Sequence, residues 1–146
     1  MNNTSLGLTP RIRQQFTFTA NDDTLNEVLE EISNEGVSFT AFTINRMRDT
    51  NLVRIVVGPP RSNDPASNRV VREVLRSAGV RFQEEEVIQL LGLITGTTGV
   101  LSRIYRALFH VVKVKAIYLG EENAIIINVS DVQTALGLLE QNNIIS

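Results

Sequence analysis

Residues 101–116, LSRIYRALFHVVKVKA, repeat the pattern of residues 25–41, LNEVLEEISNEGVSFTA, and this repetition decides the fold. Leu, Val, Leu and Ile at positions 25, 28, 29 and 32 form an apolar stripe at helical spacing. Leu, Ile, Tyr and Leu form the same stripe 76 positions later. Each stripe is followed by a segment in which apolar and polar residues alternate, Val37–Ala41 and Val112–Ala116, which predicts a strand. The chain therefore contains one structural unit twice.

The strands around these segments are also duplicated. A β-rich run follows each alternating segment, at Leu52–Val57 in one half and at Ala124–Val129 in the other. A further strand is expected before each first helix, at Gln15–Thr19 and at Val87–Ile94. Val80–Glu84 closes the first half. The strands of the two halves thus agree in order and spacing.

A second helix completes each half. Asp64 and Pro65 predict the start of one, as N-cap and first helical residue, and Ser130 with Gln133 forms a capping box for the other. Each half reads strand, helix, strand, strand, helix, strand. Because split strand-helix-strand crossovers are right-handed, both helices should cover one face of an antiparallel sheet. The predicted fold class is α+β, with two ferredoxin-like modules in tandem.

The module boundaries follow from these elements. We expect a first module at 11–84 and a second at 85–146, whose last strand is shortened because only Ile144 and Ile145 remain to form it. Residues 1–12, MNNTSLGLTPRI, contain turn formers without periodicity and predict a loose leader. Two-sided apolar strands and a truncated final strand leave surface to be covered, so we expect a homodimer.

Composition limits the chemistry. The chain of 146 residues has 42% apolar residues, which is typical of a packed globular protein. It has no cysteine and one histidine, His110, so thiol chemistry and multi-histidine metal sites are excluded, and we expect no catalytic set, metal or cofactor. A net charge of −2 argues against nucleic-acid binding, and the absence of a long apolar stretch argues against a membrane span. We expect a cytoplasmic protein.

The second half contains the most specific motif. Glu85-Glu-Val-Ile-Gln-Leu leads through Gly96-Thr-Thr-Gly99-Val-Leu101 to the helix and then to Val112-Lys-Val-Lys-Ala-Ile-Tyr118. This pattern, over nearly the whole chain, resembles tandem ACT domains, which occur attached to amino-acid biosynthetic enzymes or as free-standing proteins. In that family the first strand ends in a turn similar to Asp-Arg-Pro-Gly-Val-Leu. Here Gly99, Val100 and Leu101 match, while Gly96, Thr97 and Thr98 replace the Asp, Arg and Pro.

The resemblance implies a non-catalytic regulatory module that senses a small molecule, commonly an amino acid, where the first turn of one module meets the second strand of another. Glycine at this turn lets a ligand approach the backbone, and free N–H groups at a helix start attract a carboxylate. The expected ligand-binding residues follow: Thr95, Gly96, Thr97, Thr98, Gly99, Val100, Leu101, Ala116, Ile117 and Tyr118.

Other interpretations stay open at this point. Gly96–Gly99 is equally compatible with an ordinary turn. In the first half, Asp22 and Asp23 would repel a carboxylate and favour helix capping instead. The chain could be an assembly module without a working ligand site, or a small subunit of a biosynthetic enzyme with a protein partner. RNA-recognition modules share the strand order, but the central strand Leu52–Val57 has no aromatic residue for base stacking.

Overall fold

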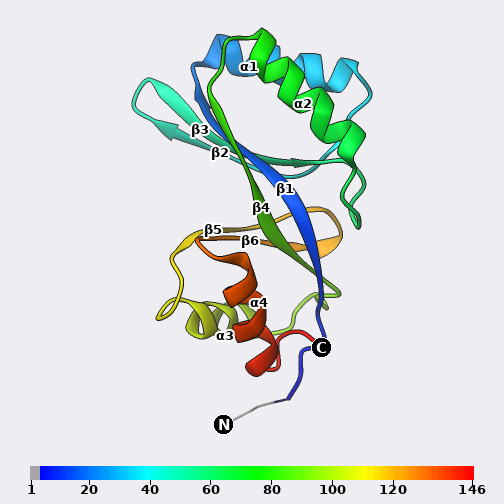
Figure 1. Cartoon of the computed structure of the whole chain (residues 1–146), viewed down its shortest axis with the longest axis vertical. Coiled ribbons are helices and arrows are strands. Elements are labelled where there is room, and N and C mark those ends of the chain that lie inside the picture. Colours follow the sequence, from blue (N-terminus) through cyan, green and yellow to red (C-terminus); the bar gives the residue numbers. More distant parts are fainter. Residues whose placement is uncertain (1–3) are drawn as a thin grey trace. The chain divides into compact units, whose positions relative to one another are not determined.

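The computed structural model describes residues 4–146, and the chain divides into two compact units (Figure 1). The first unit is Arg13–Glu85, and the second unit combines the N-terminal segment through Ile12 with Glu86–Ser146. Strands β1 (Thr9–Ala20) and β4 (Phe82–Leu91) contribute residues to both units, because each boundary falls inside a strand. The hydrogen-bonded strand order is β2-β3-β1-β4-β6-β5.

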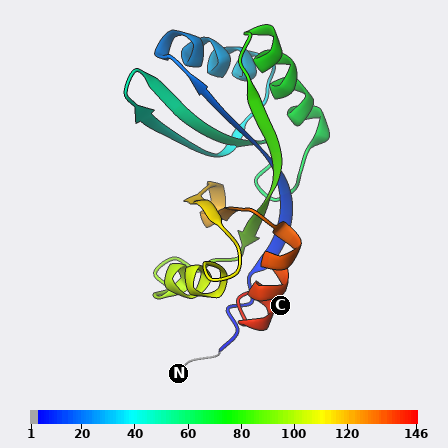
Figure 2. The same cartoon turned by 60° about the vertical axis from the view of Figure 1, so that its left-hand side comes forward.

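The unit Arg13–Glu85 has the predicted order strand, helix, strand, strand, helix, strand. Between β1 and β4 its elements are α1 (Asp22–Asn34), β2 (Phe39–Met47), β3 (Thr50–Val57) and α2 (Pro65–Ser77). Antiparallel β1 and β2 flank β3, so Phe16 of β1 and Phe42 of β2 both pair with Ile55. Both helices lie on the same face of these strands (Figure 2).

The core of this unit consists of the predicted helical stripes packed on strand side chains. Leu25, Val28 and Ile32 of α1 are buried, and so are Val71 and Leu75 of α2. They share one apolar cluster with strand residues, including Phe16, Phe18, Val53 and Ile55. Burial of such side chains contributes about 1.5–3 kcal/mol each, which makes this cluster the main stabilising element of the unit.

The unit that contains Glu86–Ser146 repeats the pattern. After β4 come α3 (Val100–Leu108), β5 (Val114–Leu119), the short 3-10 helix η1 (Glu121–Asn123), β6 (Ile125–Val129) and α4 (Val132–Gln141). Antiparallel pairing joins β6 to both β4 and β5, with Ile127 opposite Ile88 and Ile117. Ile104 and Leu108 of α3 and Leu139 of α4 are fully buried in the core. The predicted α+β fold class with two ferredoxin-like units is therefore confirmed.

The N-terminal segment is not a loose leader over its described residues, and that prediction was wrong. Leu8 is 2% exposed and belongs to the core of the second unit. The backbone N–H groups of Leu6 and Leu8 donate to the carbonyl oxygens of Asn143 and Ile144, at 2.9 and 3.1 Å. Leu8 and Ile145 form a single parallel bridge. Burial of apolar side chains from both ends of the chain orders this segment.

The helix starts were predicted with mixed success. Asp64 caps α2 and Pro65 is its first residue, as expected. The predicted capping box at Ser130 is wrong, because Asp131 is the N-cap of α4 and its carboxylate accepts from the N–H of Thr134 at 3.1 Å. The Ser130 hydroxyl instead accepts from the N–H of Lys113 at 3.0 Å. None of the described helices is both long and apolar enough to cross a membrane.

Candidate functional site

The turn between β4 and α3 contains five of the predicted ligand-binding residues. Residues 95–99 are all exposed, and Gly99 is the N-cap of α3 with φ 79° and ψ 1°. This left-handed conformation suits glycine, because a side chain there clashes with its own backbone. A Cβ atom on Gly99 would meet nothing within 4 Å. The backbone at the start of α3 is therefore open to an approaching molecule.

The start of α3 also differs from the other helix starts. In the other three α-helices of the described chain, a side chain of the N-cap residue accepts from a first-turn N–H; these N-caps are Asn21, Asp64 and Asp131. Gly99 has no side chain, so α3 has no such cap. First-turn N–H groups carry partial positive charge and need an acceptor from outside the helix. A carboxylate has the right charge and geometry to supply it.

The threonine hydroxyls of the turn have distinct hydrogen-bonding capacities. Thr97 donates its hydroxyl to the carbonyl oxygen of Ile94 at 2.8 Å, so its oxygen can still accept. Thr95 accepts from the side-chain amide of Asn123 at 2.8 Å and keeps its hydroxyl proton. The Thr98 hydroxyl forms no hydrogen bond within residues 4–146. The turn therefore offers both donors and an acceptor beside the uncapped helix.

The two predicted residues that follow the turn differ in exposure. Val100 is 5% exposed and packs in the core, so only its backbone faces the turn. Leu101 is 61% exposed. Of this pair, only the Leu101 side chain is available to a ligand or partner.

The predicted residues on β5 also divide between two faces. Ile117 packs against the core that α3 and α4 cover. Ala116 and Tyr118 alternate with it and pair with Asn128 and Ile126 of β6. Tyr118 is 8% exposed, so it is a buried residue rather than an open contact surface.

Asn123 is the residue that sequence reasoning missed. It lies in the turn between β5 and β6, and its hydrogen bond to Thr95 brings that turn beside the loop before α3. The two residues are separated by 28 positions, and no periodicity or motif connects them. The only signal was a polar residue in the turn between two strands, which is too common to be informative.

The equivalent turn of the first unit has a different chemistry. Asn21 caps α1 by accepting from the N–H of Thr24 at 2.9 Å, so capping by Asp22 and Asp23 was the wrong assignment. Asp22 instead accepts from Arg46 at 2.9 and 3.0 Å and from Asn51 at 2.9 Å. These partners occupy the Asp22 carboxylate.

Acid should weaken this contact. The hydrogen bonds from Asn51 and Arg46 hold the pKa of Asp22 below its ordinary value. A carboxyl with a depressed folded-state pKa stabilises the fold above its unfolded pKa, and that contribution is lost as the pH falls through the folded value. We expect Asp22→Asn to reduce the steepness of the acid limb in urea midpoints measured from about pH 6 to about pH 2. Asp23→Asn, on the same turn, is the matched control, and an equal effect of both would contradict the assignment.

The glycine at the start of α3 gives a second prediction. Gly99→Ala should lower the free energy of unfolding by about 1–2 kcal/mol, because alanine is disfavoured at φ 79°. Gly137→Ala, inside α4, should raise it by about 0.5–1 kcal/mol, because the added Cβ atom would meet nothing within 4 Å. Urea unfolding measures both. Equal changes in the two variants would show that backbone conformation at Gly99 is unimportant.

These features define the class of fold: two ferredoxin-like units in tandem, as the resemblance to tandem ACT domains implied. Protein BT0572 from Bacteroides thetaiotaomicron is similar with TM-score 0.67 and 16% identity, over 90% of this chain and 89% of that one. The regulatory subunit of aspartate kinase from Thermus thermophilus is similar with TM-score 0.62 and 11% identity, over 95% and 98%. Aspartokinase III of E. coli, in complex with aspartate and ADP, is similar with TM-score 0.55 and 17% identity, over 97% of this chain and 34% of that one.

At sequence identities this low, the structural similarity establishes the fold alone and does not establish a function. No protein-family model matches the sequence, and no curated protein matches it either. Among residues 4–146 no group of three or more His, Cys, Asp or Glu side chains is arranged to hold a metal ion.

Proposed function

We propose that this chain is a non-catalytic regulatory module that binds a small metabolite, specifically an amino acid, at the turn before α3. The observation that carries the proposal is the uncapped helix start at Gly99, next to exposed threonine hydroxyls. The similarity in fold to a regulatory subunit of aspartate kinase supports a regulatory role. In this proposal a second module or subunit covers the ligand, because the turn is exposed in one chain.

The hydrogen-bonding groups of the turn suit both ends of an amino acid. The first-turn N–H groups of α3 and the Thr98 hydroxyl are donors for a carboxylate. The Thr97 oxygen, whose proton is used on the Ile94 carbonyl, is an acceptor for an ammonium group. The exposed Leu101 side chain provides apolar contact for a ligand side chain.

The test is a thermal-shift screen with the twenty amino acids, followed by calorimetric titration of those that raise the melting temperature. A ligand at about 100 times its Kd should stabilise the folded state by about 2.7 kcal/mol. Thr98→Val keeps the shape of the side chain and removes the donor, so binding should weaken about tenfold, which corresponds to a net hydrogen bond of about 1.4 kcal/mol. Thr19→Val, an exposed threonine on β1, is the control. Absence of any shift at millimolar concentration would contradict amino-acid binding.

A second candidate function is an assembly module without a ligand site. The exposed apolar side chains favour it: on β2, an end strand of the hydrogen-bonded order, Phe42 is 58% exposed and Met47 is 50% exposed. Such side chains on an end strand promote pairing with another chain. We therefore propose a homodimer for both candidate functions. The assembly module would in addition bind a protein partner. Light scattering at micromolar concentration tests the dimer, and a monomeric mass would contradict it.

A further inference from the structure

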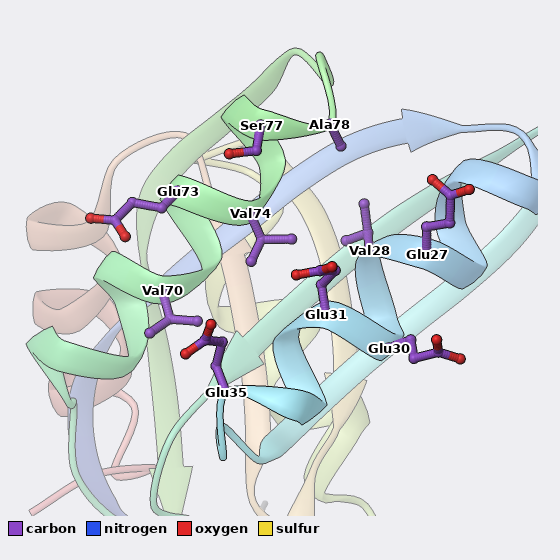
Figure 3. A pocket seen from close by; sticks show the side chains of 10 residues that line it. All are labelled: Glu27, Val28, Glu30, Glu31, Glu35, Val70, Glu73, Val74, Ser77 and Ala78. Carbon is purple, nitrogen blue, oxygen red and sulfur yellow. The ribbon is translucent and has the colours of Figure 1, made fainter.

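A groove between α1 and α2 has an apolar floor and an acidic rim (Figure 3). Its volume is about 460 Å³. Val28 of α1 and Val70 and Val74 of α2 form the apolar part. The carboxylates on its rim are Glu27, Glu30, Glu31, Glu35 and Glu73. Figure 3 shows the side chains of Glu31 and Glu35 in the space between the two helices, with the two α2 valines facing them.

The acidic rim costs stability within the chain. Residues 22–35 contain six acidic and no basic side chains. Glu27, Glu31 and Glu35 are spaced four residues apart along one side, where like charges repel, and the last two lie at the negative end of the helix dipole. None of Glu27, Glu30, Glu31 and Glu35 forms an ion pair or hydrogen bond with its side chain within residues 4–146. A cationic occupant would relieve this repulsion.

The second unit presents a surface of opposite charge. Residues 87–120 contain four cations, Arg103, Arg106, Lys113 and Lys115, and no acidic side chain. Arg103 is used internally, because its guanidinium donates to the backbone oxygens of Thr4 and Asn142. The side chains of Arg106 and Lys113 form no ion pair with any described residue.

An apolar ridge lies along α3, the helix that also carries Arg106, and ends at the C-cap residue Phe109. Leu101, Tyr105 and Phe109 are 61%, 50% and 44% exposed, at spacings of four residues. The rings of Tyr105 and Phe109 are stacked, with centroids 5.4 Å apart and planes at 5°. Eight residues of helix span about 12 Å, and Glu27 to Glu35 in the groove covers the same number of residues. The ridge therefore matches the groove in length as well as in charge and polarity.

We propose that the α3 ridge of one copy (Leu101, Tyr105 and Phe109) docks in the α1–α2 groove of a second copy. The ridge would cover Val70 and Val74, which are only partly buried, while Arg106 and Lys113 would pair with the rim carboxylates. The two surfaces differ, and each copy carries one of each. The ridge shares Leu101 with the proposed amino-acid site at the turn before α3, whereas Tyr105 and Phe109 lie outside that site. The charge variants described below leave Leu101 unchanged.

The test is a charge exchange measured by sedimentation velocity on the full chain. In the groove variant, Glu31→Lys is combined with Glu35→Lys; in the ridge variant, Arg106→Glu is combined with Lys113→Glu. Each variant alone should associate at least about tenfold more weakly than the unmodified chain. An equimolar mixture should recover association, because the reversed groove matches the reversed ridge and the two unmodified surfaces still match each other. Circular dichroism should show that both variants are folded.

Two controls separate this contact from other associations. Glu140→Lys and Arg11→Glu change exposed charges outside both surfaces and should leave association unchanged. Raising NaCl from about 50 mM to about 500 mM should weaken self-association of the unmodified chain severalfold, because salt screens exposed ion pairs. The proposal would be overturned if the unmodified chain were a monomer at low salt or if the mixture did not recover association. It would also be overturned if Phe42→Ser, on β2, abolished association while the groove and ridge variants did not.

Discussion

Replacing Arg13 with alanine should lower the free energy of unfolding by about 3 kcal/mol, one of the two largest effects we expect. The Arg13 side chain is 0% exposed, and its Nη2 donates to the carbonyl oxygens of Val57 and Pro59 at 3.0 and 2.9 Å. These bonds hold the segment that leads from β3 toward α2. Alanine would leave the buried Val57 oxygen without this donor and remove the packing of the long side chain.

Burial and charge act in opposite directions at this arginine. Burial lowers the pKa of Arg13, whereas the nearby Asp64 carboxylate, which also caps α2, raises it. Because arginine keeps its charge in proteins, the fold must compensate a buried cation rather than neutralise it. Arg13→Lys retains the charge but lacks the planar guanidinium, so it should restore only part of the stability.

The measurement is urea unfolding followed by circular dichroism. Arg11→Ala is the matched control, since Arg11 is on the same strand and is exposed. Within the described residues, its side chain donates only to the neighbouring Pro10 carbonyl, at 3.1 Å. It should change stability by no more than about 0.5 kcal/mol. Similar losses at both arginines would mean that the two backbone contacts of Arg13 contribute little.

Ile104→Ala should also lower the free energy of unfolding, by about 2–5 kcal/mol. Ile104 is 0% exposed at the centre of α3 and packs in the core with Ile88, Leu108 and Ile127. Alanine removes three carbons from a close-packed environment and leaves a cavity that a short helix between two strands cannot easily collapse.

A residue on the same helix provides the control for this core substitution. Leu101 is 61% exposed, so Leu101→Ala should change stability by no more than about 0.5 kcal/mol in dilute protein. Thermal unfolding of both variants tests the difference. If Ile104→Ala were as mild as Leu101→Ala, α3 could not be packed as described.

The candidate site was predictable in part. The glycine turn could be read from the sequence because Gly99 precedes a helical stripe, and that is a local signal. The partner of Thr95 could not be read, since Asn123 comes from a different turn that only tertiary structure brings near. For the same reason the sequence showed Asp22 at a helix start but not Arg46 and Asn51, which reach it from β2 and β3.

The sequence by itself determined the repeat, the order of elements in both halves, the α+β class and most residues that face each core. These follow from hydrophobic periodicity, which is a property of neighbouring residues along the chain. Two residues of the predicted stripe in the second half, Leu101 and Tyr105, are exposed instead. The tertiary structure decided that Leu6 and Leu8 belong with the end of the chain, and which polar side chains occupy the Asp22 carboxylate. It also set the apolar ridge of α3 and the acidic groove on separate units. These contacts join residues that are far apart in the sequence. They depend on which apolar surfaces and polar groups still lack a partner after each element has formed, and no pattern of neighbouring residues specifies them.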